Sequence, residues 1–184
     1  MGADGSGERR LASLGPDVQF LKLSPDGRSL AFDAKSERGG TRIWVAAADG
    51  SGSRPLTREQ DALSYPVWSP DGSRLAAQGR RGDDVDVVVL PAAGGALRRL
   101  TSQPGQSWAS AWSRDGSEVV FAALREGLWS IRSVGLDRGE ERTLVSEARL
   151  GAYLRYPAIS PQGDLLVYER AETTGNVWMM ELQR

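Results

Sequence analysis

Short apolar runs alternate with polar turn sequences along the whole chain, and hardly any stretch shows the helical period of 3.6 residues. In the first complete unit, runs rich in β-branched and aromatic residues predict strands over residues 18–23, 29–34, 41–47 and 53–56. The later units fit the same template of four short strands. The pattern therefore predicts an all-β chain.

One turn sequence, Ser-Pro-Asp-Gly or a close variant, recurs between the first two strands of each unit. It begins at Ser24, Ser69, Ser113 and Ser160, so the copies are 45, 44 and 47 residues apart. Proline presets φ for the second turn position, aspartate bonds the nearby backbone, and glycine adopts positive φ. A fixed period in this range is typical of a repeat architecture.

First strands are apolar on both faces, which indicates sheets that are covered on both sides. The position before each turn serine holds Leu23, Trp68, Trp112 or Ile159. Radially stacked blades provide such covering, whereas a sandwich of about sixteen strands would not require a strict period. We therefore predict a β-propeller of four-stranded antiparallel blades, forming one domain over residues 1–184. The predicted blades lie roughly at 13–57, 58–101, 102–145 and 146–184.

A second marker, an Arg-x-Leu strand, ends each of the first three units but is missing from the last. Its leucines are Leu11, Leu56, Leu100 and Leu144, so the chain begins with a spare copy. Pairing of residues 8–12 with 176–182 would complete the last blade and close a four-bladed ring without exposed edges. The alternative is that the chain is the C-terminal part of a larger propeller of six or more blades.

The segment Tyr-Pro-Val-Trp-Ser-Pro-Asp-Gly-Ser-Arg-Leu-Ala at 65–76, followed by a strand and Arg98-Arg99-Leu100-Thr101, resembles the TolB-type, WD-like propeller repeat. Such repeats occur in periplasmic TolB proteins, in the gating propellers of prolyl oligopeptidases and dipeptidyl peptidases, and in sensor regions of bacterial winged-helix regulators or serine/threonine kinases. The resemblance implies a recognition or scaffold domain, and it allows a covalently linked domain in a longer parent protein. It also implies a periplasmic location, while the lack of a signal peptide in residues 1–7 leaves a cytoplasmic one open.

Composition excludes several partners and chemistries. The chain has 23 basic and 24 acidic residues, a net charge of −1, so no charge excess favours nucleic acid or an anionic membrane. No apolar run approaches the roughly 20 residues of a membrane-spanning helix. The chain contains no histidine and no cysteine, which excludes a Ser-His-Asp triad, a Cys-His pair and a thiolate or histidine metal site.

We therefore expect no enzyme activity, no cofactor and no metal. Asp83, Asp84 and Asp86 could furnish oxygen ligands for calcium, but their spacing matches no known loop and favours a solvated loop instead. The turn aspartates Asp26 and Asp71, with Asp115, are expected to be structural.

The candidate binding site comes from the architecture. Propellers offer ligands the mouth of the central channel, near the starts of the first strands. These starts hold Gln19, Ser64, Tyr65, Trp108, Arg155 and Tyr156. This mixture of aromatic, polar and cationic groups predicts a surface that binds a protein or peptide. Two alternatives stay open for the function, a gating propeller of a serine peptidase and a sensory propeller. For the residues, the alternative is that Tyr65 and Tyr156 only fill the inner ends of the blades.

Overall fold

The structure is a computed structural model that describes residues 14, 17–35 and 40–172. In this part the chain forms strands and one short 3₁₀ helix, η1 (Glu59–Asp61), in agreement with the all-β prediction. The strands are β1 (Val18–Leu23), β2 (Ser29–Lys35), β3 (Thr41–Ala47), β4 (Arg54–Pro55), β5 (Leu63–Trp68), β6 (Arg74–Arg81), β7 (Asp84–Pro91), β8 (Arg98–Arg99), β9 (Gln106–Trp112), β10 (Glu118–Arg125), β11 (Leu128–Gly135), β12 (Glu141–Ser146), β13 (Ala152–Ile159) and β14 (Leu166–Glu172).

The strands group into antiparallel blades in chain order. Blade 1 is β1–β4, blade 2 is β5–β8, blade 3 is β9–β12, and β13–β14 is the described part of blade 4. Blades 2 and 3 share a continuous sheet through one parallel bridge between Val85 and Gln106. Of the four strands predicted in the first unit, two have the predicted bounds, the second extends to Lys35, and the last shortens to Arg54–Pro55.

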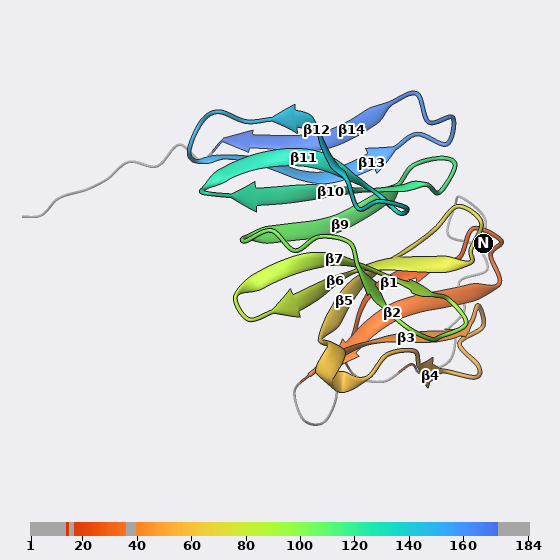
Figure 1. Cartoon of the computed structure of the whole chain (residues 1–184). Helices are drawn as coiled ribbons and strands as arrows, with labels where there is room; N and C mark the ends of the chain where they lie inside the picture. The colour runs from red at the N-terminus through yellow and green to blue at the C-terminus, as the bar shows by residue number, and fades with distance from the viewer. Residues whose placement is uncertain (1–13, 15–16, 36–39, 173–184) are drawn as a thin grey trace, which may run out of the picture.

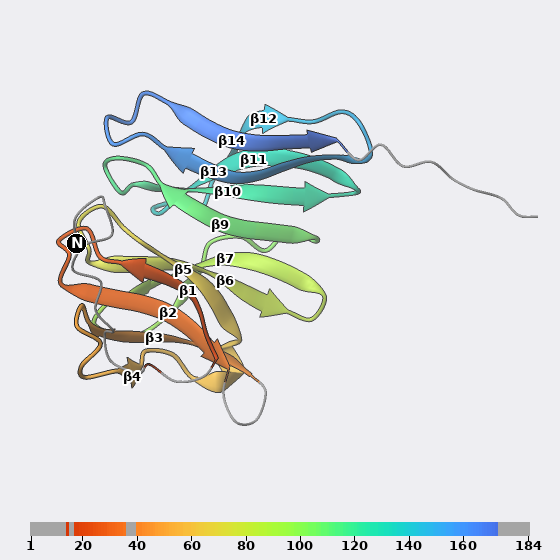
Figure 2. The same ribbon diagram turned by 180° about the vertical axis from the view of Figure 1, so that it is seen from behind.

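The blades are stacked side by side, with blade 1 and β13–β14 at opposite ends of the described part (Figure 1). The view from behind shows the same order (Figure 2). The predicted pairing of residues 8–12 with 176–182 lies outside the described residues. The described part is therefore a partial propeller of consecutive blades.

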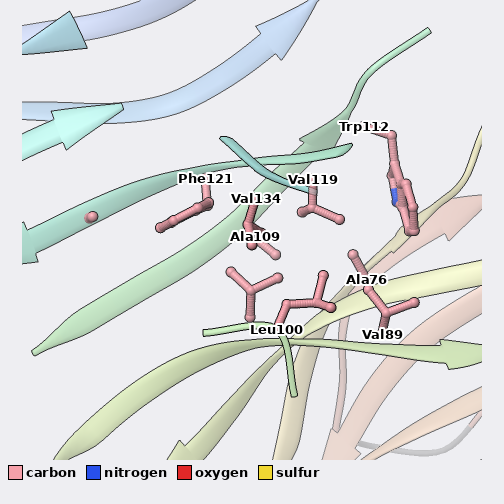
Figure 3. Close-up of a cluster of buried hydrophobic side chains, with 10 residues drawn as sticks. Ala76, Val89, Leu100, Ala109, Trp112, Val119, Phe121 and Val134 are labelled. Atoms are coloured by element: carbon pink, nitrogen blue, oxygen red, sulfur yellow. The ribbon is translucent and has the colours of Figure 1, made fainter. Parts of the chain in front are cut away.

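Core residues fill the spaces between neighbouring blades. Leu75 and Ala77 pack toward blade 1, whereas Ala76 on the same strand packs toward blade 3, and all three are fully buried. The cluster between blades 2 and 3 also contains Phe121 and Trp112 (Figure 3). A strand between two neighbouring blades is therefore apolar on both faces. The first strands, for which the sequence predicts this covering, differ: β9 contains buried residues, whereas Leu21 and Leu23 of β1, in an end blade, are 45% and 55% exposed.

Tryptophans before the turn serine connect blades 2 and 3 to the blade that precedes each of them. The indole Nε1 of Trp68 donates to the carbonyl oxygen of Lys22 at 3.1 Å, and that of Trp112 donates to Val67 at 3.0 Å. These bonds satisfy the indole N–H groups while their rings pack between blades. They fix the first strands of consecutive blades relative to one another.

The Ser-Pro-Asp-Gly turn has the same geometry in each blade. In the second copy, Ser69 Oγ donates to Asp71 Oδ1 at 2.6 Å, the same oxygen accepts from the backbone N–H of Ser73, and Gly72 has a φ of +70°. In the fourth copy glutamine replaces the aspartate, and the serine hydroxyl of Ser160 donates to Asp164 instead. The turn thus keeps its hydrogen bond although the sequence departs from the repeat.

Replacing Gly72 with alanine should destabilise the protein by about 1 kcal/mol, because the turn requires positive φ. A Cβ at this position would be 3.9 Å from Pro25 Cδ, so backbone conformation and not crowding causes the cost. Chemical denaturation measures the difference. Gly135→Ala is the matched control, since Gly135 also has open space but no positive φ. Equal stability of the two variants would contradict this account.

Candidate functional site

The first strands of three blades carry an aromatic residue in the left-handed backbone conformation. Phe20, Tyr65 and Tyr156 have φ values of +46°, +56° and +51°. Each lies at a β-bulge, where two residues of the first strand face one residue of the second strand. A non-glycine residue in this region costs on the order of 1–3 kcal/mol, and such residues are frequent at functional sites.

Blade 3 has the bulge but not the aromatic side chain. Its register shift falls between Ala109 and Ala111, and neither these residues nor Ser110 has positive φ. The recurring strain is therefore not a requirement of the bulge itself. It accompanies the aromatic residues in blades 1, 2 and 4.

These three residues form what we call the first-strand aromatic cluster. The ring centroids of Phe20 and Tyr65 are 3.6 Å apart. Burial raises the pKa of the Tyr65 phenol, and the charges of Asp33 and of the Tyr156 phenol raise it further. The three side chains are 42%, 37% and 70% exposed in chain order, so the cluster presents apolar surface to a partner.

The predicted site residues lie at equivalent positions along the first strands of the blades. Four of them pair with second-strand residues in equivalent register: Gln19 with Asp33, Ser64 with Gln78, Trp108 with Ala122, and Arg155 with Glu169. Tyr65 and Tyr156 follow Ser64 and Arg155 directly along the chain. The repeat therefore brings the six predicted residues to the same height on the first strands of four blades.

Arg155 is held by an ion pair and by two tyrosine rings. Its Nη2 lies 2.9 Å from Glu169 Oε1, and its guanidinium carbon is 5.5 Å and 5.6 Å from the ring centroids of Tyr153 and Tyr156. Its Nε has no hydrogen-bond partner. Stacking on aromatic faces orients the guanidinium, while the unpartnered Nε is buried and is not exposed to a ligand.

Trp108 has a different environment from the other predicted residues. It stacks on Trp129 with a centroid distance of 4.9 Å, and Trp129 contacts the ring of Tyr153 at 5.7 Å. Trp108 is half-buried and packs against the core between blades 3 and 4. Its position indicates a role in packing between blades.

Asp33 belongs to this region but was not among the sequence candidates. It is only 2% exposed, and its Oδ1 has no hydrogen-bond partner. Burial raises the pKa of Asp33 to about 6, although hydrogen bonds from the backbone of Tyr65 and of Asp33 itself act in the opposite direction. The sequence feature that could have identified Asp33 is a carboxylate directly after the apolar run Leu30-Ala31-Phe32.

The acidic residues at the start of β7 do not form the solvated loop that the sequence favours. Asp86 is fully buried and accepts hydrogen bonds from Arg81 Nε at 3.0 Å, Arg99 Nη1 at 2.9 Å and Thr101 Oγ1 at 3.2 Å. Asp84 pairs with Arg81 at 3.3 Å, while Asp83 is exposed. These carboxylates are engaged by cations of the chain itself, which makes Asp84 and Asp86 structural residues.

The turn aspartates are also engaged within the protein. A hollow of about 360 Å³ between the first two turns is lined by Asp26 and Asp71 among others. Hydrogen bonds from the side chains of Ser69 and Ser73 lower the pKa of Asp71 to about 2, and bonds from Ser113 and Ser117 do the same for Asp115. These carboxylates therefore accept hydrogen bonds that stabilise the turns, which is the structural role that the sequence predicts.

Residues 14, 17–35 and 40–172 contain neither a metal-binding cluster nor a membrane-spanning helix. No group of three or more acidic, histidine or cysteine residues is arranged to hold a metal ion. No helix in this part of the chain is long and apolar enough to cross a membrane.

Comparison with known proteins identifies the family. The TolB beta propeller domain family matches residues 1–184, so the chain belongs to this family. Among curated proteins, none matches its sequence.

Solved structures show the same fold in longer proteins. A TolB from Agrobacterium tumefaciens is similar with a TM-score of 0.69 at 20% identity, over 86% of this chain and 59% of that one. TolB from Acinetobacter baumannii has a TM-score of 0.71 at 16% identity, over 87% and 39% of the two chains. A dipeptidyl aminopeptidase IV from Bacteroides ovatus has a TM-score of 0.62 at 13% identity, over 83% and 25%. The chain thus spans between a quarter and three fifths of these relatives and matches a portion of each.

Proposed function

We propose that this chain is a non-catalytic recognition domain that binds a protein or peptide at the first-strand aromatic cluster and Arg155. The observation that carries the proposal is the exposure of Phe20, Tyr65 and Tyr156 in strained backbone at equivalent positions of three blades. Strain that recurs at one level, together with exposed aromatic side chains, is typical of a binding surface.

The surface has the composition of an interaction site. Tyrosine and arginine are enriched among the residues that contribute most to binding at protein interfaces, and here Arg155 lies over the Tyr156 ring. The rigid strands hold these side chains at fixed positions, which reduces the entropy lost on binding. The absence of histidine and cysteine in all 184 residues supports a role without nucleophilic or metal catalysis by this chain.

The gating role of a peptidase propeller is a second candidate, supported by the similarity of fold to the Bacteroides ovatus dipeptidyl aminopeptidase IV. In that case a catalytic domain would have to lie outside these residues, because the chain itself contains no histidine for a triad. In both roles the same aromatic surface would contact a peptide.

Tyr156→Ala should weaken peptide binding by at least about tenfold, as expected for an exposed aromatic anchor. Peptides selected from a random display library on the full chain serve as ligands, and titration calorimetry measures their affinity for each variant. Leu128→Ala is the matched control, because Leu128 is an exposed apolar residue, 38% accessible, in another hairpin. The proposed site would be contradicted if the peptides lost affinity equally for Tyr156→Ala and Leu128→Ala, or if they lost affinity for neither variant.

A further inference from the structure

Asp33 is a buried carboxylate for which the described residues provide no counter-ion. It is 2% exposed, its Oδ1 has no hydrogen-bond partner, and no ion pair of the described part includes it. A buried charge without a partner is strongly unfavourable, so natural proteins pair or neutralise such groups. Asp86, equally buried, has two arginines and a threonine hydroxyl around it.

The position of Asp33 relates it to the first-strand aromatic cluster. It pairs in register with Gln19 of β1, the residue directly before Phe20. The Phe20 ring in turn contacts the ring of Tyr65, with centroids 3.6 Å apart, and the charge of Asp33 contributes to the raised pKa of the Tyr65 phenol. The unpaired carboxylate therefore lies next to the exposed aromatic surface.

The cations of this region do not satisfy Asp33. Arg155 is neutralised by Glu169 at 2.9 Å. Lys22 and Lys35, on the strands that pair around Asp33, are exposed. Arg42 on β3 pairs with Glu59 at 3.3 Å. No cation of the described residues pairs with Asp33, so a positive group supplied by a ligand would neutralise its charge.

We propose that the first-strand aromatic cluster, with Asp33 beneath it, binds an organic cation carried by the peptide partner, either a lysine ammonium or an N-terminal α-ammonium. This inference rests on the proposed peptide-binding function and specifies its ligand group. The faces of Phe20, Tyr65 and Tyr156 attract a cation through their ring quadrupoles. The carboxylate behind them adds a full negative charge in surroundings of low polarity, where charge attraction is stronger than in water.

The test uses three C-terminally amidated tripeptides as probes, titrated into the full chain by calorimetry and by NMR of the tyrosine rings. Acetyl-Ala-Lys-Ala-amide carries the side-chain ammonium, Ala-Ala-Ala-amide carries the α-ammonium, and acetyl-Ala-Ala-Ala-amide is neutral. We expect saturable binding of one or both cationic peptides, with shifts of the Tyr65 and Tyr156 signals, and none for the neutral peptide. The two cationic arms distinguish the source of the ammonium group.

Asp33→Asn should weaken binding of the cationic peptide by about tenfold or more, since the charge is lost and the shape is kept. Asp83→Asn is the matched control, because Asp83 is an exposed aspartate outside the site and should leave affinity unchanged. Denaturation curves of both variants establish that they remain folded.

Failure of this inference is distinct from failure of the proposed function. Equal affinity of wild type and Asp33→Asn, binding of the neutral peptide as tight as that of the cationic ones, or no binding of either cationic peptide would overturn the cation site. Display-selected peptides that depend on Tyr156 but not on Asp33 would in that case leave the proposed recognition function standing.

Discussion

Replacing Asp33 with asparagine is expected to stabilise the protein at pH 7 by roughly 2 kcal/mol. Burial raises the pKa of this carboxyl from its ordinary 3.8 to about 6, so the folded protein disfavours the charged form that predominates at pH 7. A shift of this size corresponds to about 3 kcal/mol. The asparagine amide recovers most of this free energy and loses part, because burying its two N–H donors has a desolvation cost of its own.

The pH dependence provides a sharper signature than the stability itself. The folded state binds the Asp33 proton more tightly than the unfolded state, so this group contributes stability that is fully present below about pH 3.8. The contribution is lost as pH rises from there through about 6. Asparagine does not titrate. The advantage of the variant over wild type should therefore be small at pH 4 and grow up to about pH 7.

Urea denaturation of both proteins at pH 4, 5, 6 and 7 measures this difference directly. Asp137→Asn is the control, since Asp137 is exposed and should show no such growth with pH. A wild-type protein that is more stable than Asp33→Asn at pH 7 would show that the carboxylate is satisfied within the fold. A stabilised variant that binds cationic peptides poorly would show that Asp33 serves function at the expense of stability.

Features that depend on neighbouring residues in the chain could be predicted from the sequence. Proline, aspartate and glycine at Pro70-Asp71-Gly72 specify a turn through their own backbone preferences, and β-branched runs such as Val87-Val88-Val89 specify strands. The fixed spacing of the turns then indicated stacked blades, and the family match and the fold confirm it. The same repeat predicted that the candidate site residues lie at equivalent positions of the first strands.

Features that depend on contacts between strands or blades could not be predicted. Tyr65 lies at a bulge against β6, and although an aromatic residue recurs at this position in three blades, its positive φ and its contact with the Phe20 ring depend on the pairing of strands and blades. The polar run at Asp83-Asp84 resembles a loop, yet Asp86 is buried because Arg99 and Thr101, more than ten residues later, come to lie beside it. Asp33 is buried because blade 2 covers it.

Asp33 and Asp86 show that burial alone does not determine what a carboxylate contributes. Both are aspartates with at most 2% exposure on central strands of adjacent blades. Asp86 receives three hydrogen bonds, two of them from arginine, while Asp33 Oδ1 receives none. Since charge in the interior is stabilising only when it is neutralised, the same substitution should have opposite effects at the two positions.

Asp86→Asn should destabilise the protein by about 3 kcal/mol, because removing the charge leaves Arg81 and Arg99 facing each other across a neutral amide. This value is at the lower end for a broken buried pair, since the two arginine side chains are 44% and 30% exposed and can still be hydrated. The asparagine amide also presents N–H donors to the Thr101 hydroxyl, which donates to the carboxylate in the wild type and accepts a hydrogen bond from the backbone N–H of Val87. Urea denaturation at pH 7 measures the loss, and Asp83→Asn, three residues earlier and exposed, should change stability by less than about 0.5 kcal/mol. A loss below about 1 kcal/mol for Asp86→Asn would mean that the arginines hold blade 2 together without this carboxylate.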